Sequence, residues 1–191
     1  MDMNRGFRDA AKTFLPNAKI IIDRFHVVRY CTEAMENVRR NLQKTLPKAQ
    51  RRYFKRSRRL LLAHRDRLSE EDRTAVDVML RFSDRLLQAY ALKEAFYDFM
   101  EAPSRGEAER LMDFWLEACD RLNLPEFKPC RKMLANWRPY ILNAFDIRLS
   151  NGFTEGCNNA IKTLKRLAFG FRSFTAFRAR ILLAARTHPY I

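Results

Sequence analysis

Long apolar runs are absent from this sequence. It holds no stretch of about 18 uninterrupted apolar residues, and no apolar leader precedes the first charged residues. We therefore expect neither a membrane-spanning segment nor a secretory signal. Paired cysteines are absent too, because the four cysteines are widely scattered and form no Cys-x-x-Cys pair: Cys31, Cys119, Cys130 and Cys157. This pattern predicts reduced thiols in a cytoplasmic protein.

Acidic residues are scarce relative to basic ones. The chain has 22 aspartates and glutamates against 37 lysines and arginines, which gives a formal charge of +15 and a pI near 10.2. Such an excess predicts a polyanionic partner, most commonly nucleic acid, and makes membrane binding the weaker alternative. An apolar share of 47% with fifteen phenylalanines provides for a packed core, which argues against a disordered chain.

Strand-forming segments are almost missing. Only residues 18–22, Ala-Lys-Ile-Ile-Ile, form a short β-branched run bounded by turn residues, and this run predicts one buried strand. A helix over residues 7–15, ended by Pro16-Asn17, precedes it. A lone strand needs neighbours for its backbone groups. Either it pairs with another copy of the chain, or the sheet to which it belongs lies upstream, and we favour the second explanation.

The rest of the sequence has helical periodicity, so we expect a predominantly α protein. Capping residues and prolines divide it: Ser69 and Ser104 begin helices, and Pro139 predicts a kink inside one. Trp115 and Trp137 are expected in the core. The expected helices cover residues 27–46, 69–100 with a break near Ser83, 103–122, 128–145 and two further segments after residue 150.

Residues 44–67 form a densely basic segment. Ten lysines and arginines stand there against Asp66 alone. The segment could be a solvated helical face, but its self-repulsion would be relieved by a phosphate backbone, so we expect DNA contact there. The candidate contacts are Arg51, Arg52, Lys55 and Arg56.

The segment 150–166 contains the last acidic residue of the chain, Glu155, at the start of a helix. Helical spacing predicts a buried stripe on one side of this helix, formed by Cys157, Ile161, Leu164 and Ala168. Its other side carries Glu155 and the candidate DNA contacts Asn158, Lys162 and Arg166, and Lys165 is a further candidate DNA contact on this helix. By itself a glutamate in a first helical turn is more often a surface residue that suits the helix dipole. A metal-binding role requires partner carboxylates, for which Asp2 and Asp23 are the candidates.

Several strings in this order and spacing resemble the ISL3 family of bacterial insertion-sequence transposases. They are Asp2-Met3, Leu15-Pro16-Asn17-Ala18, Asp23-Arg24-Phe25-His26-Val27-Val28 and Ser150-Asn151-Gly152-Phe153-Thr154-Glu155-Gly156, followed by Asn158, Lys162, Lys165 and Arg166. The resemblance implies a DDE enzyme with an RNase H-like core, which cuts and joins DNA with Mg²⁺ or Mn²⁺.

The resemblance also implies three catalytic, metal-binding carboxylates. Asp2 matches the second and Glu155 the third, whereas no position of this chain matches the first. Asp23 and His26 match an Asp-x-x-His string after the second acid. In an alternative alignment Asp23 is itself the second acid. We prefer Asp2, because a helix and a strand then follow it in the order that the RNase H-like core requires.

The resemblance divides the chain into three parts. Residues 1–28 correspond to a remnant of a truncated RNase H-like α/β core with one clear strand, residues 29–147 to an all-helical insertion, and residues 148–191 to C-terminal core helices that carry Glu155. We therefore expect the C-terminal part of a cytoplasmic bacterial transposase that is inactive alone. Its expected partners are transposon-end and target DNA. A homo-oligomer is possible, and the sequence leaves the oligomeric state open. The alternative is a non-catalytic basic helical protein that binds DNA as a regulator.

Overall fold

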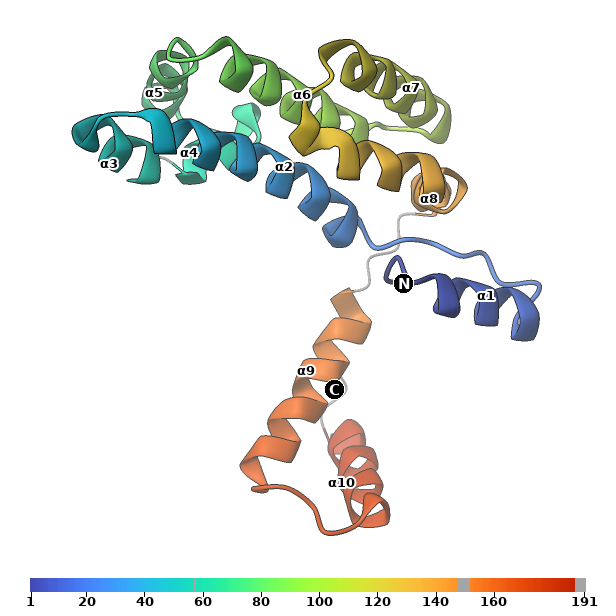
Figure 1. Ribbon diagram of the computed structural model, residues 1–191. Helices are drawn as coiled ribbons and strands as arrows, with labels where there is room; N and C mark the ends of the chain where they lie inside the picture. The colour runs from blue at the N-terminus through green and yellow to red at the C-terminus, as the bar shows by residue number, and fades with distance from the viewer. Residues whose placement is uncertain (57, 148–151, 188–191) are drawn as a thin grey trace. The chain divides into compact units, whose positions relative to one another are not determined.

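The computed structural model describes residues 1–56, 58–147 and 152–187, without the side chains of residues 153–155 and 187. The chain consists of two compact units, Met1–Arg148 and Leu149–Ile191. All regular elements of the described residues are helices, in agreement with the predominantly α prediction (Figure 1). They are α1 (Arg5–Phe14), α2 (Arg24–Thr45), α3 (Lys48–Arg56), α4 (Arg58–Leu62), η1 (Arg65–Arg67), α5 (Glu70–Leu80), α6 (Asp84–Glu101), α7 (Arg105–Leu122), η2 (Pro125–Phe127), α8 (Lys128–Asp146), α9 (Gly152–Leu167) and α10 (Phe174–Thr187).

The core of the first unit lies between α2, α6, α7 and α8. Figure 1 shows α2 running beside α6 and α8, and these helices are in direct contact. Trp115 on α7 is fully buried, as expected, and its indole Nε1 donates to the Leu92 carbonyl oxygen of α6 over 2.7 Å. Trp137 on α8 is also buried. Large apolar side chains at helical spacing therefore hold the four helices together.

Short polar caps set the helix boundaries. Ser69 accepts from the Asp72 amide, Ser83 from the Leu86 amide and Ser104 from the Glu107 amide. These contacts satisfy amide donors of the first turn that have no partner inside the helix. The cap at Ser83 explains the break that the sequence predicts between α5 and α6, and α8 continues through Pro139.

The prediction of a strand at residues 18–22 is wrong, because the structure assigns no strand to any of the residues that it describes. The segment is extended, and Ile20 and Ile22 are buried as a strand would bury them. Its backbone groups, however, bond to other elements. The Ile22 amide donates to the Tyr140 carbonyl of α8 over 3.2 Å, and the Ile20 carbonyl accepts from Asn143 Nδ2 over 2.8 Å. Apolar pattern alone does not distinguish a strand from an extended segment that lies along a helix.

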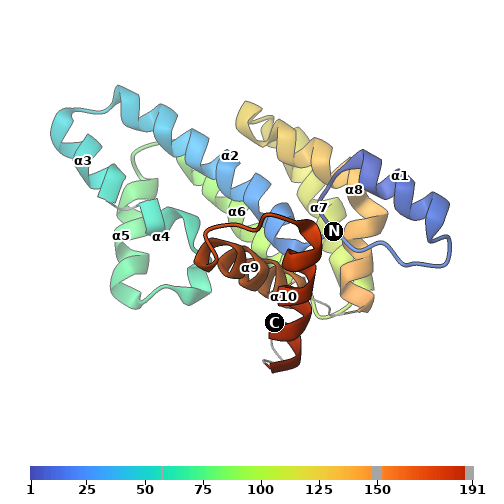
Figure 2. The same ribbon diagram turned by 90° about the horizontal axis from the view of Figure 1, so that it is seen from below.

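Helix α1 presents its polar side to the rest of the first unit. Helix α1 lies beside α8 (Figure 2). Arg8 and Lys12 lie over the aromatic rings of Trp137 and Tyr140 on α8, at 5.4 and 5.6 Å from the ring centroids. None of its residues is buried, and Phe7 and Phe14 are 61% and 79% exposed. The apolar side of α1 is therefore solvent-exposed.

The described residues of the second unit form the helices α9 and α10. Cys157, Ile161 and Leu164 of the predicted buried stripe are only half-buried, and Ala168 is exposed beyond the end of α9 at Leu167. The turn that follows has two residues with left-handed backbone, Phe169 at φ 51° and Gly170 at φ 100°. A helix commonly ends in this way, usually with glycine in the left-handed position.

Candidate active site and DNA-contacting surface

Asp2 and His26 lie in contact. The Asp2 Oδ1 atom is 2.9 Å from His26 Nε2, and the two side chains are 58% and 31% exposed. They are brought together because the Asp23 amide donates to the Met1 carbonyl over 3.1 Å, which holds the Met1–Asp2 segment beside the start of α2. His26 stands in the first turn of that helix. The structure thus joins two of the residues that the sequence singled out separately.

Asp23 has a different place. It is the N-cap of α2, and its Oδ1 atom accepts from the Phe25 amide over 3.0 Å. One carboxylate oxygen of Asp23 is therefore engaged in holding the helix start. This role explains an aspartate at this position without any metal.

Asp2 and His26 line an open pocket of about 470 Å³ at the junction of α1 and α2. Its other lining residues are Met3, Asn4, Phe7, Arg29, Tyr30 and Glu33. Glu33 is paired with Arg29, whose Nε atom is 2.6 Å from Glu33 Oε1. Within the described part of the chain, no three histidine, cysteine, aspartate or glutamate side chains are arranged to hold a metal ion. Asp2 can therefore contribute to a metal site only together with other residues.

Glu155 belongs to α9, near the start of that helix. Its side chain is outside the described residues, and α9 is part of the second unit, whereas Asp2 is part of the first. A joint site of Asp2 and Glu155 therefore stays a prediction. The candidate DNA contacts on the same helix are all exposed: Asn158, Lys162, Lys165 and Arg166.

The basic helix α3 has one buried anchor and an exposed cationic side. Phe54 is fully buried, whereas Arg51, Arg52, Lys55 and Arg56 are exposed. Arg51 also serves the fold, because its Nη2 atom donates to the Lys44 and Leu46 carbonyl oxygens at the end of α2, over 3.3 and 3.2 Å. No carboxylate of the described residues pairs with the other three cations. They are available to a phosphate backbone.

A buried carboxylate on α2, Glu36, is the centre of an arginine cluster that sequence reasoning missed. Arg39 binds it through two hydrogen bonds of 2.8 Å, Arg40 donates to it over 2.9 Å, and Arg58 of α4 is 3.3 Å away. The spacing of Glu36 to Arg39 and Arg40 is a signal in the sequence, since residues three and four apart face each other on a helix. Arg58 joins the cluster only through the fold.

The electrostatics of Glu36 are dominated by these arginines. Burial raises the pKa of this carboxyl group, but the hydrogen bonds and charges of Arg39, Arg58 and Arg40 outweigh that effect and lower the pKa to about 2. Glu36 is thus ionised at neutral pH. Its role is to hold guanidinium groups in place.

The other buried ionisable residues support the fold. Lys93 on α6 is fully buried, pairs with the neighbouring Glu94 carboxylate, and lies 3.9 Å from the centroid of the Tyr90 ring. Burial lowers the pKa of Lys93. The Glu94 carboxylate also accepts from the Arg65 amide over 3.1 Å, which attaches η1 to α6.

Comparison with known proteins identifies the family. A family model described as a transposase, that of the ISL3-type DDE enzymes, matches residues 1–181. The chain belongs to the ISL3 family of DDE transposases. It is 28% identical to the transposase of IS1001 from Bordetella parapertussis, over 96% of this chain and 46% of that protein. It is 30% identical to the transposase of IS1557 from Mycobacterium tuberculosis, over 91% of this chain and 44% of that protein.

The chain therefore spans a little under half the length of these two ISL3-family relatives. A further relative, from Lactococcus lactis, is named an ATP-dependent protease and is 34% identical over 69% of this chain and 38% of that protein. The present sequence has no Gly-Lys pair, which a phosphate-binding loop of the Walker type requires. No solved structure matches the chain. No helix of its described residues is long and apolar enough to cross a membrane.

Proposed function

We propose that this chain is part of a transposase that cleaves DNA at the ends of an insertion sequence and joins those ends to target DNA. The observation that carries the proposal is the contact of Asp2 with His26 in a chain of this family, because Asp2 stands where the resemblance places the second catalytic acid. A basic chain with exposed cations on α3 and α9 suits the DNA substrate.

Catalysis by such an enzyme depends on Mg²⁺ or Mn²⁺, which would be held by Asp2 and Glu155 together with the missing first carboxylate. The Asp2 carboxylate fits this task, since it is 58% exposed and only its Oδ1 atom has a partner among the described residues. When bound, such metal ions activate a water or 3′-hydroxyl oxygen for attack on phosphorus and stabilise the leaving oxygen.

The side chains around Asp2 have distinct tasks in this proposal. The contact of His26 Nε2 with Asp2 Oδ1 over 2.9 Å restricts the carboxylate, whereas Oδ2 has no partner among the described residues. Asn158, Lys162, Lys165 and Arg166 hold the phosphate backbone near Glu155, because they occupy the exposed side of the same helix.

No position of the 191 residues matches the first catalytic carboxylate of the family. We therefore propose that this chain does not cleave DNA by itself and that it still binds DNA. The runner-up function follows from the same point: a non-catalytic, DNA-binding form of the transposase that acts as a regulator. Its basis is the set of exposed cations on α3, because DNA binding by these side chains requires no metal ion.

Replacement of Glu155 by glutamine in a complete transposase that contains this chain tests the proposal. We expect loss of transposon-end cleavage with unchanged DNA affinity, because the amide retains the side-chain shape but is a poor ligand for a hard cation. A Glu117→Gln variant is a matched control, since it changes an exposed glutamate on α7 away from all candidate residues. Full cleavage by the Glu155 variant would contradict the catalytic role of Glu155.

A further inference from the structure

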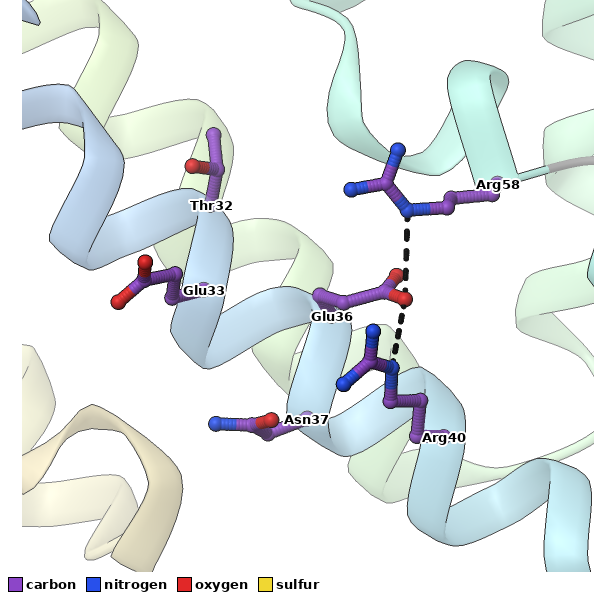
Figure 3. A pocket seen from close by; sticks show the side chains of 6 residues that line it. All are labelled: Thr32, Glu33, Glu36, Asn37, Arg40 and Arg58. Carbon is purple, nitrogen blue, oxygen red and sulfur yellow. Dashed lines mark hydrogen bonds and ion pairs between the residues drawn. The ribbon is translucent and has the colours of Figure 1, made fainter.

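The arginine cluster around Glu36 borders a pocket of about 390 Å³ on the outer side of α2 (Figure 3). Thr32, Glu33, Asn37 and Arg40 of α2 line it together with Glu36, and Arg58 of α4 lines it as well. Figure 3 shows Arg40 and Arg58 reaching the Glu36 carboxylate from opposite sides. Two guanidinium groups from different elements are therefore held close to one buried anchor.

The two exposed arginines use only part of their hydrogen-bonding capacity. Arg40 and Arg58 each contact Glu36 through Nε, at 2.9 and 3.3 Å, and their side chains remain 62% and 56% exposed. Among the described residues, no acceptor pairs with the Nη atoms of either side chain. Each guanidinium therefore still presents its planar pair of Nη donors, the geometry that matches phosphate oxygens.

Arg39 differs from these two arginines. It is 4% exposed, and its remaining Nη1 donor is bound to Gln43 Oε1 and to the Phe54 carbonyl of α3, over 2.9 and 3.2 Å. Arg39 thus fixes Glu36 and joins α2 to α3. Four of its five N–H donors are engaged, and its burial keeps a ligand away.

The local charge is positive in spite of the two glutamates. Glu33 is paired with Arg29, and Glu36 is shared by Arg39, Arg40 and Arg58, so four guanidinium groups stand against two carboxylates. The carboxylates are already engaged, and the excess charge is on the exposed arginines. An anion that enters this pocket can therefore bind the Nη donors of Arg40 and Arg58.

We propose that Arg40 and Arg58 form a clamp for a phosphate of the DNA backbone, with Glu36 as the positioning residue that holds both guanidinium groups. The pocket includes a residue of the basic segment that directly follows α3, because Arg58 comes two positions after Arg56, the last residue of that helix. DNA bound along the exposed cations of α3 would thus reach the clamp. This inference rests on the proposed DNA substrate and adds a contact within the helical part of the chain.

DNA binding as a function of salt concentration tests the clamp. The 191-residue chain is titrated against duplex DNA of arbitrary sequence by fluorescence anisotropy. For an Arg40→Gln/Arg58→Gln variant we expect the slope of log K against log salt to decrease by about one and the Kd to rise about tenfold, as for loss of one phosphate contact. Circular dichroism checks that the fold is retained, which we expect because both side chains are largely exposed.

Two further variants separate a clamp from a general effect of charge. Arg110→Gln/Arg121→Gln removes the same charge from exposed positions on α7 and should leave the slope nearly unchanged. Arg40→Lys/Arg58→Lys keeps the charge but removes the planar forks, so it should weaken binding almost as much as the glutamines do. If the α7 control loses as much affinity as the clamp variant, or if the lysines restore wild-type binding, the clamp is overturned.

The remaining outcomes distinguish the inference from the proposed function. Salt-sensitive binding by the wild-type chain with an unchanged Arg40→Gln/Arg58→Gln variant would overturn the clamp and leave the DNA substrate intact. Absence of any DNA binding by the wild-type chain would refute both. Inorganic phosphate is the second probe: if it binds at the pocket while DNA affinity does not depend on Arg40 and Arg58, the site belongs to a free anion, and the DNA clamp is again overturned.

Discussion

Two aspartates near the start of α2 show how position decides the role of a carboxylate. Asp2 contacts His26, whereas Asp23 caps the helix through the Phe25 amide. Asparagine accepts the same capping bond but is a poor metal ligand. We therefore expect a complete transposase with Asp2→Asn to lose transposon-end cleavage and one with Asp23→Asn to retain it. The reverse result, measured by release of labelled DNA ends, would make Asp23 the second catalytic acid.

The shifted pKa of Glu36 predicts a pH-dependent contribution to stability. Its folded-state pKa of about 2 is below the ordinary 4.5, so its stabilising effect is complete above about pH 5 and is lost as the pH falls toward 2. The shift corresponds to about 3 kcal/mol. We expect Glu36→Gln to lower the free energy of unfolding most at neutral pH.

Urea unfolding of the wild type and of the Glu36→Gln variant between about pH 2 and 7 measures this effect. The difference between the two proteins should shrink as the pH falls, because the glutamine does not titrate. A constant difference over this range would mean that the Glu36 charge contributes nothing. Asp120→Asn is a suitable control, since this aspartate forms an exposed pair with Arg131.

At the scale of elements, α2 depends on its first turn, because this helix contacts α6, α8 and α3. Removing the Asp23 cap by alanine should lower the free energy of unfolding by about 1 kcal/mol, whereas asparagine should have little effect. Thermal unfolding followed by circular dichroism compares the two variants. Equal stability of the alanine variant would show that water replaces the cap.

The helices were largely predictable from the sequence, and the Ala18–Ile22 segment was not. Ser69 and Ser104 cap helices where the sequence places them, and Ser83 caps α6 at the predicted break, because capping depends on bonds within a few residues. A strand depends instead on a distant partner. Here Tyr140 and Asn143 take that place, and no local pattern indicates that a helix supplies the bonds.

The candidate site divides in the same way. The family strings identified Asp2, Asp23 and His26, but the pairing of Asp2 with His26 follows from the path of the chain at Met1. Only part of the arginine cluster could be predicted from the sequence. Helical spacing places Arg39 and Arg40 beside Glu36, whereas Arg58 contacts Glu36 from another helix. Helical spacing predicts contacts within one helix, whereas contacts between distant elements can be identified only once the fold is known.

At the scale of the whole molecule, the first unit contains the entire described core, from Ile22 to Leu142. We therefore expect residues 1–147 alone to unfold in one cooperative transition at nearly the melting temperature of the whole chain. Differential scanning calorimetry measures this. A fragment that does not unfold cooperatively would show that the second unit is required for the first.

The outward apolar side of α1 affects how the purified protein behaves. Phe7, Phe14 and Leu15 present their side chains to solvent on a molecule whose net charge of +15 keeps copies apart. Added salt screens that repulsion while leaving hydrophobic attraction intact. Light scattering should therefore detect self-association that grows with ionic strength, in the same range in which DNA dissociates, and Phe7→Ser/Phe14→Ser should suppress it. Concentrated solutions of this protein should then self-associate least at low salt, where its affinity for nucleic acid is highest.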